Sequence, residues 1–134
     1  MNLDYSKTIL SKINDMNFTH IDAHTHIQFK PFAHDRDEVI RRARDAGIAI
    51  VNVGSDLKNS EDAVRLAEQF DSGMYAVVGV HPTDAEESFD VNALTSLARH
   101  EKVVAIGECG LDYFHVKDEA KKAIQKQVFI EHIK

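Results

Sequence analysis

Two histidines end an apolar run near the start of the chain, in the segment Ile21–His26 with the sequence IDAHTH. Because successive strand residues alternate between faces, His24 and His26 would point to the same side of a strand and could bind one metal ion. Spacing alone says little, since eight histidines in 134 residues give about 0.5 His-x-His pairs by chance. Their position at the end of a predicted strand makes them a candidate metal site.

Three further predicted strands also end in polar residues, namely Ser55 with Asp56, then His81, then Glu108. Glu108 follows an apolar run, where a buried carboxylate must be paired, protonated or bound to a metal. With His24 and His26 it would form a His₂Glu set, typical of hydrolytic zinc-type sites that keep one position open for water. The alternatives are a buried polar pair of histidines and a structural ion pair at Glu108.

Three more residues are candidates for supporting roles. His81 precedes Pro82, which favours an extended backbone and keeps the imidazole of His81 near the end of its strand. There the imidazole could contact a phosphate, transfer a proton or cap the next loop. Asp112 could orient a ligand or stabilise its own turn. Asp22 is expected on the same face of the strand as the two histidines, but deeper in the strand. It would support the metal ligands without touching the metal, or it would anchor a neighbouring loop.

The remaining reactive side chains are expected to be structural or solvated. Cys109 is predicted to be a small buried residue rather than a nucleophile, because no His-Asn pattern accompanies it. The other side chains expected to be solvated are those of His20, His34, His100, His115 and His132. Lys30, Arg36 and Lys117 lie in loops at the expected mouth and could meet phosphates, but they too are expected to be solvated.

Apolar and periodic segments alternate along the chain. Strands are predicted at Thr19–Ala23, Ile48–Val53, Met74–Val80 and Val103–Gly107. Helices are predicted at Asp35–Ala46, Glu61–Phe70, Asp90–His100 and Asp118–Lys134, the second after a cap at Asn59 or Ser60. The order is therefore βα four times.

Parallel βα repeats occur in doubly wound sheets and in (β/α)₈ barrels, and both place ligands at the carboxyl ends of the strands. No Gly-x-Gly-x-x-Gly loop follows the first strand, whereas His-x-His at the first strand and Glu at the fourth suit a barrel mouth. A barrel has eight units in about 250 residues. The prediction is an α/β chain of the (β/α)₈ TIM-barrel type, covering the first four units.

Composition indicates one globular domain, with 43% apolar residues in 134. Residues 1–17 are assigned to an N-terminal extension and residues 18–134 to the barrel half. The net charge of −6 gives no basic face, so a phosphate ligand would need help from metal ions. A single cysteine, and no signal-like or membrane-spanning apolar segment, lead us to expect a cytoplasmic protein without membrane contact.

Three segments resemble successive motifs of the TatD family of metal-dependent deoxyribonucleases: Ile21–His26, the VGVHP sequence of 78–82, and the AIGECGLDY sequence of 105–113. The helical segment Gln125–Phe129 resembles the family's next helix, so the resemblance spans residues 18–134. The resemblance implies a barrel hydrolase that cleaves DNA with the help of two divalent metal ions. These ions would be Zn, Mn or Mg. The resemblance also implies that His24 and His26 bind one metal, that Glu108 bridges two, and that His81 lies near the substrate phosphate.

The family also has two metal-binding histidines and an aspartate in the second half of the barrel, and nothing up to Lys134 matches them. Four units would leave open sheet edges and expose the inner faces of the second and third strands. We therefore expect self-association and weak or absent activity of this chain alone. The alternatives are an amidohydrolase acting on a small amide or lactone, and a non-catalytic half-barrel assembly fragment.

Overall fold

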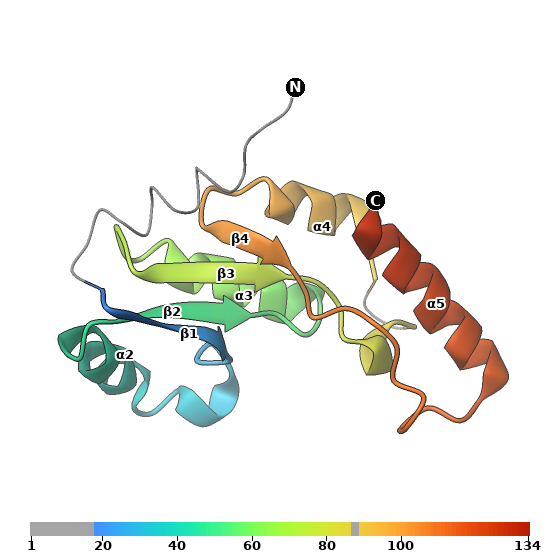
Figure 1. The fold of residues 1–134 in the computed structure, drawn as a ribbon, viewed down its shortest axis with the longest axis horizontal. Coiled ribbons are helices and arrows are strands. Elements are labelled where there is room, and N and C mark those ends of the chain that lie inside the picture. The colour runs from blue at the N-terminus through green and yellow to red at the C-terminus, as the bar shows by residue number, and fades with distance from the viewer. Residues whose placement is uncertain (1–17, 87–88) are drawn as a thin grey trace.

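A four-stranded parallel sheet forms the centre of the molecule (Figure 1). The computed structural model describes residues 18–86 and 89–134, so the predicted extension at residues 1–17 lies outside the described residues. The strands are β1 (His20–Thr25), β2 (Ile48–Val53), β3 (Met74–Val78) and β4 (Val103–Ile106). Their order in the sheet is their order in the chain, β1-β2-β3-β4, and every neighbouring pair is parallel.

Three helices connect successive strands, namely α2 (Arg36–Asp45), α3 (Leu57–Ala67) and α4 (Val91–Ala98), and α5 (Glu119–Ile133) follows β4. Short 3₁₀ helices lie at η1 (Lys30–Phe32) and η2 (Pro82–Asp84). The predicted βα alternation is confirmed. Among the described residues no helix is both long and apolar enough to cross a membrane.

The helices that connect the strands cover one face of the sheet only. Ile40 of α2, Val64 of α3 and Leu97 of α4 pack with Ile50 and Val78 of the sheet in one apolar cluster. A doubly wound sheet would have helices on both faces, whereas a barrel keeps them on the outside. One-sided cover and sequential strand order together make this sheet the first half of a (β/α)₈ barrel.

The opposite face, which faces the interior of a barrel, has its own apolar cluster. It contains Ala49, Val51, Val53, Tyr75 and Val77, each no more than 8% exposed. The expectation that the inner faces of β2 and β3 would meet water is therefore wrong for these residues. Exposure is instead found on the outer strands, where Ile21 is 45% and Ile106 46% exposed.

The helices α3, α4 and α5 each follow a residue whose side chain caps the helix, whereas Asp35 before α2 makes no such bond. Asp90 and Asp118, the first residues of two predicted helices, are instead the N-caps of α4 and α5. The predicted cap of the preceding helix at Asn59 or Ser60 is wrong, because the Asp56 carboxylate accepts a 2.6 Å hydrogen bond from Asn59 N and α3 begins at Leu57. Ser60 is instead fully buried, with its hydroxyl bonded to both backbone groups of Gly79.

An irregularity in β1 changes which side chains share a face. Asp22 pairs with Ile50 and Thr25 pairs with Asn52, so three steps along β1 match two along β2. One extra residue in β1 reverses the alternation of its side chains, so those after the irregularity point to the opposite face of the sheet from the one that regular alternation predicts. Asp22 therefore lies on the face of Ile50, opposite to His24, and the expected shared parity is wrong. β1 also continues to Thr25, two residues beyond the predicted end.

Candidate metal site

Three potential metal ligands meet where β1 and β4 end. His24 Nε2 lies 3.2 Å from His26 Nε2 and 3.1 Å from Glu108 Oε1. The distance from His26 Nε2 to the same Glu108 oxygen is 3.9 Å. Ligand atoms of these residues all lie within 4.8 Å of one another. The structure thus brings together the three residues that the sequence singles out, although they are more than eighty positions apart in the chain.

These separations fit a divalent cation. Metal bonds of about 2.0–2.1 Å in a tetrahedral site place two donor atoms about 3.3 Å apart. The observed donor distances of 3.1, 3.2 and 3.9 Å are close to this value. Two imidazole nitrogens and one carboxylate oxygen are also a donor set that zinc and other hydrolytic metals accept. The residues present therefore fit a metal ion, with coordination positions left for further ligands.

The ring of His26 is held in one orientation. Its Nδ1 lies 2.7 Å from the carbonyl oxygen of Val53, which can only accept a hydrogen bond. The proton of the neutral ring is therefore on Nδ1, and Nε2 keeps a lone pair directed toward His24 and Glu108. Phe29 stacks on the ring with centroids 4.6 Å apart, and Gln28 donates to the same Val53 carbonyl at 2.7 Å.

The loop after His26 is fixed by an arginine. Arg36 at the start of α2 donates from Nε to Ile27 O at 2.8 Å and from Nη2 to Gln28 O and Phe29 O at 3.0 and 3.3 Å. The expectation that Arg36 is solvated is wrong, because its guanidinium binds three successive carbonyl groups. It therefore supports the residues that surround the His26 ring.

Glu108 is positioned by close contact of three strand ends. Its backbone N donates to Gly54 O at 3.0 Å, and Gly107 N donates to Val78 O at 2.9 Å. A Cβ at Gly79 would lie 2.6 Å from the carbonyl carbon of Gly107, so only glycine permits this approach. The carbonyls of Val53 and Gly54 thus fix His26 and Glu108 from the same end of β2.

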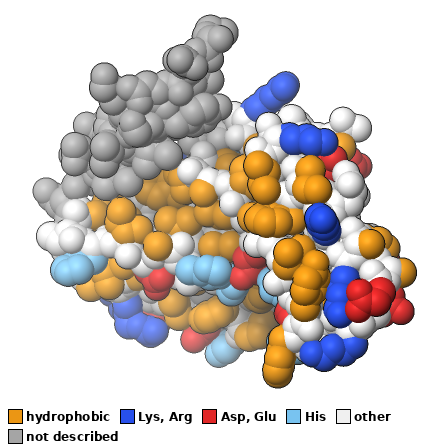
Figure 2. Space-filling view, turned by 45° about the vertical axis from the view of Figure 1, so that its right-hand side comes forward, with side chains coloured by type: hydrophobic (Ala, Val, Ile, Leu, Met, Phe, Trp, Pro, Cys, Tyr) orange, Lys and Arg blue, Asp and Glu red, His pale blue; other side chains and the backbone are white. Residues whose placement is uncertain are grey.

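A hollow of about 550 Å³ opens beside these ligands, lined among others by His24, His81, Glu108, Cys109 and Asp112. Figure 2 shows histidine and acidic side chains gathered in a band across this face, next to hydrophobic side chains. The Cys109 side chain is exposed, which corrects the expectation of burial. Partial desolvation raises the pKa of its thiol, so a reactive thiolate is disfavoured.

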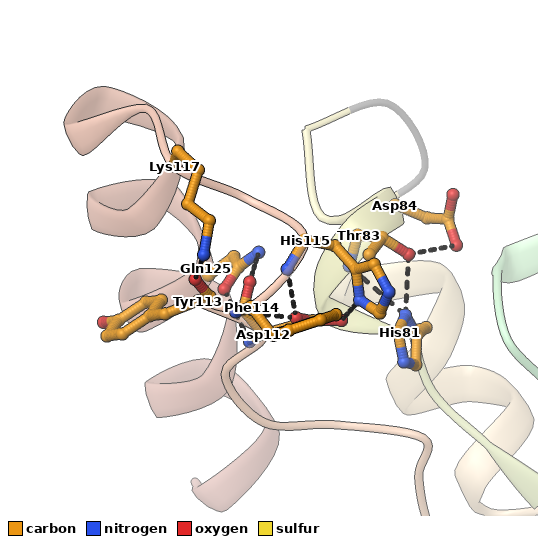
Figure 3. A network of polar contacts seen from close by, with 9 residues as sticks. All are labelled: His81, Thr83, Asp84, Asp112, Tyr113, Phe114, His115, Lys117 and Gln125. Atoms are coloured by element: carbon orange, nitrogen blue, oxygen red, sulfur yellow. Dashed lines mark hydrogen bonds and ion pairs between the residues drawn. The ribbon is translucent and has the colours of Figure 1, made fainter.

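His81 caps the next loop and also borders the hollow. Its backbone N donates to Ser55 O at 2.7 Å, and its Nδ1 lies 2.7 Å from Thr83 Oγ1 and accepts from Thr83 N at 3.3 Å (Figure 3). The ring therefore caps η2, as the loop-cap alternative has it. Because Nδ1 accepts, the neutral ring carries its proton on Nε2. His81 also lines the hollow.

Asp112 stabilises its own turn and also borders the hollow. Its carboxylate accepts from the backbone N of Phe114 and His115 at 3.1 and 2.9 Å and lies 2.6 Å from His115 Nδ1. These bonds, chiefly the backbone bond from His115, lower the pKa of Asp112. Gln125 of α5, which is 2% exposed, accepts from Asp112 N at 2.9 Å. Asp22 is exposed and accepts a 3.4 Å bond from His24 N.

Two histidines expected to be solvated have structural partners instead. His132 of α5 accepts a 3.1 Å bond from Val80 N, and His100 accepts from Lys102 N at 3.2 Å. His115 pairs with Asp112, but its side chain is 66% exposed and solvated as expected. The partner of His132 is 52 positions away along the chain. No local sequence pattern identifies such a pairing. His34, with a side chain that is 79% exposed, is solvated as expected.

The fold and the site define a class. A parallel sheet with helices outside and a His₂Glu cluster at the carboxyl ends of its strands is the arrangement of metal-dependent hydrolases built on (β/α)₈ barrels. Comparison with known families agrees, because the sequence model of the family described as TatD related DNase matches residues 21–134. The chain belongs to this family, and membership implies the use of divalent metal.

Individual relatives support the assignment. YabD of Bacillus subtilis (strain 168), an uncharacterized metal-dependent hydrolase, is 41% identical over 115 residues, which are 84% of this chain and 44% of that protein. The 3'-5' ssDNA/RNA exonuclease TatD of Shigella flexneri serotype 5b (strain 8401) is 40% identical over 105 residues, 74% of this chain and 40% of the enzyme. The chain thus spans less than half the length of these curated relatives.

A solved structure has the same fold. The crystal structure of YJJV, a TatD homolog from Escherichia coli K12, superposes with a TM-score of 0.73 at 33% sequence identity. The match covers 88% of this chain and 46% of that chain. The predicted fold class is confirmed, and the family favours a nuclease over the amidohydrolase alternative.

Proposed function

We propose that the chain contributes one half of the active site of a nuclease that hydrolyses phosphodiester bonds of DNA with divalent metal ions. The observation that supports this best is the convergence of His24, His26 and Glu108 ligand atoms within 4.8 Å at the carboxyl ends of the strands. In this proposal His24 and His26 bind one ion and Glu108 bridges it to a second. Zn, Mn and Mg are the candidate ions.

The chemistry follows from the charges and donors around the hollow. Bound divalent ions act as Lewis acids toward a phosphoryl oxygen and offset the negative charge of a substrate phosphate. This chain has a net charge of −6 and needs that compensation. His81 presents an Nε2 proton at the hollow and would donate it to a phosphate oxygen, while its Nδ1 is held by Thr83. Asp112 would keep the bordering loop in place.

The substrate class rests on the relatives. The curated relative from Shigella flexneri is named a 3'-5' ssDNA/RNA exonuclease, and DNA is the substrate that we propose for this chain. The further histidines and aspartate of the family would come from a second barrel half. We further propose that the exposed outer strands, where Ile21 and Ile106 are almost half exposed, pair with that half or with a second copy. A cytoplasmic location is part of the same proposal.

A chimaera tests this function. Residues 18–134 are joined to the second half of YabD from Bacillus subtilis, which supplies the remaining strands. We expect Mn²⁺-dependent release of nucleotides from single-stranded DNA, and a loss of turnover with retained metal content in the His81→Ala chimaera. His34→Ala, at an exposed histidine, is the matched control. A folded, metal-loaded chimaera without nuclease activity would contradict the proposal.

A further inference from the structure

The loop between β4 and α5 presents an aromatic ring to solvent beside the hollow. Phe114 is 79% exposed, more than the other large hydrophobic residues in the part of the chain that the structure describes. Its neighbour Tyr113 is 43% exposed, and Leu111, which lines the hollow, is 47% exposed. A large ring so fully in water has no role in the packing of this chain, so a binding partner has to be considered.

The backbone that presents this ring is fixed. The Asp112 carboxylate accepts hydrogen bonds from the backbone N of Phe114 and His115, and Asp112 N donates to the buried Gln125 of α5 (Figure 3). Asp112 lines the hollow together with Glu108. Because successive Cα atoms are 3.8 Å apart, the Cα of Phe114 lies at most about 7.6 Å from that of Asp112. The backbone that carries the ring is therefore held close to the border of the hollow by a preorganised turn.

Cations accompany both aromatic rings of the loop. Lys117 Nζ lies 5.4 Å from the centroid of the Phe114 ring and donates to Tyr113 O at 3.0 Å. Lys122 Nζ lies 5.4 Å from the centroid of the Tyr113 ring. His115 meets the Phe114 ring edge-on, with centroids 4.9 Å apart. An acidic chain thus places basic side chains and aromatic rings side by side at the border of its candidate site.

Proteins that bind single strands combine these two features, since bases stack on aromatic rings and cations approach the phosphates. We propose that Phe114 stacks on an unpaired base of a single nucleic-acid strand, one of whose phosphates lies in the hollow beside His24 and Glu108. Lys117 lies close enough to the ring to approach the next phosphate of that strand. This inference rests on the proposed function, because it takes the strand to be the substrate.

The geometry also defines the kind of strand. A base in a duplex already stacks on both faces, so only an unpaired base offers a free face to Phe114. Contact through a ring face reads no hydrogen-bonding pattern, and the subsite would accept all four bases. Phe114 would thus favour single strands over duplexes without selecting a sequence.

The chain contains no tryptophan, which makes a direct test possible. In the whole chain, Phe114→Trp introduces one fluorophore at the proposed subsite, and stacking on a base quenches indole emission. The probe is a phosphorothioate oligothymidylate of about eight nucleotides, within the site sizes of single-strand-binding folds, added with Mn²⁺; its backbone resists hydrolysis. The control is Ile133→Trp, at a residue that is 70% exposed near the other end of α5. We expect saturable quenching at position 114 and none at position 133.

A second measurement tests binding of the oligonucleotide in variants that contain no introduced tryptophan. Fluorescence anisotropy of a labelled oligothymidylate should show binding that weakens about tenfold in Phe114→Ala and is kept in Phe114→Tyr. Equal binding by wild type and Phe114→Ala, or binding without quenching in the Phe114→Trp variant, would overturn the inference. A buried, unquenched indole at position 114 in a dimer detected by light scattering would overturn it in favour of a second copy.

Failure of the inference can be told apart from failure of the proposed function. Metal-dependent hydrolysis of an oligonucleotide of abasic sugars, which has no ring to stack, depends on the metal site and on the phosphate backbone alone. In the YabD chimaera, Phe114→Ala should leave this reaction unchanged and raise the KM for single-stranded DNA about tenfold. An unchanged KM for DNA would contradict the role of Phe114, whereas loss of both reactions in the parent chimaera would contradict the nuclease itself.

Discussion

The two middle strands and the two outer strands differ in burial and in the residues that they position. All of β3 is buried, and so is β2 from Ala49 onward. β1 and β4 contain no buried residue, yet β1 holds His24 and Glu108 follows β4. The buried strands β2 and β3 therefore contribute most to folding stability, whereas the exposed strands β1 and β4 position the candidate metal ligands. The ligands lie on or just after the exposed strands, and two of them, His26 and Glu108, are held by hydrogen bonds to Val53 and Gly54 at the end of buried β2.

The largest expected effect concerns the stability of the middle strands. Met74 of β3 is fully buried, and Met74→Ala should lower the free energy of unfolding by about 2–5 kcal/mol, because a cavity remains in the core. Urea denaturation measures it. The matched change on an outer strand, Ile21→Ala at a residue 45% exposed, should stay within about 0.5 kcal/mol. Similar losses for the two variants would show that the strands do not differ in this way.

A smaller effect on stability, but a clear one on metal binding, is expected at Arg36. Removal of its guanidinium in Arg36→Ala frees the carbonyls of residues 27–29 and loosens the surroundings of His26. Metal affinity should fall about 10- to 100-fold, as is usual when a residue that orients the metal ligands without touching the metal is removed. Titration calorimetry with Zn²⁺ measures it, and Arg41→Ala, with its exposed guanidinium on the same helix, is the control. Unchanged affinity in Arg36→Ala would limit Arg36 to a structural role.

The smallest effect is a pH dependence of stability at Asp112. The folded chain lowers the pKa of this carboxyl below its ordinary value of 3.8, so the ionised form is favoured in the folded state. Its contribution is complete above that value and is lost as the pH falls through the lowered pKa. Thermal unfolding of wild type and Asp112→Asn should therefore differ at about pH 6, and the difference should disappear as the pH falls through the lowered pKa. A constant difference across this range would exclude the charge of Asp112 as the cause.

Much of the fold could be predicted because the signals are local. Apolar runs and helical periodicity follow from adjacent residues, and the βα order follows from them. The ligand set could also be predicted, since His24, His26 and Glu108 each follow or end an apolar run. Residue types and positions at strand ends suffice for this, without knowledge of distances.

The remaining features depend on contacts between distant segments. Asn52 interrupts the apolar strand 48–53 and is fully buried, bonded to Thr25 Oγ1 at 2.9 Å and to Ile27 N at 3.3 Å. A polar residue inside an apolar run was the available signal for it. The irregularity that separates Asp22 from the histidines arises in strand pairing, and the three carbonyls bound by Arg36 come together only in the folded loop. Neither has a signature in the sequence.

Metal content tests the central claim most directly. The chain, dialysed against Zn²⁺ or Mn²⁺ and analysed by elemental mass spectrometry, should bind metal through His24, His26 and Glu108. The His24→Ala/His26→Ala double variant should lose that metal while its far-UV circular dichroism stays unchanged, because β1 is exposed and both rings lie outside the apolar clusters. A variant with His20 and His34 replaced by Ala should keep it. Stoichiometric metal retained by the His24→Ala/His26→Ala variant would contradict the account.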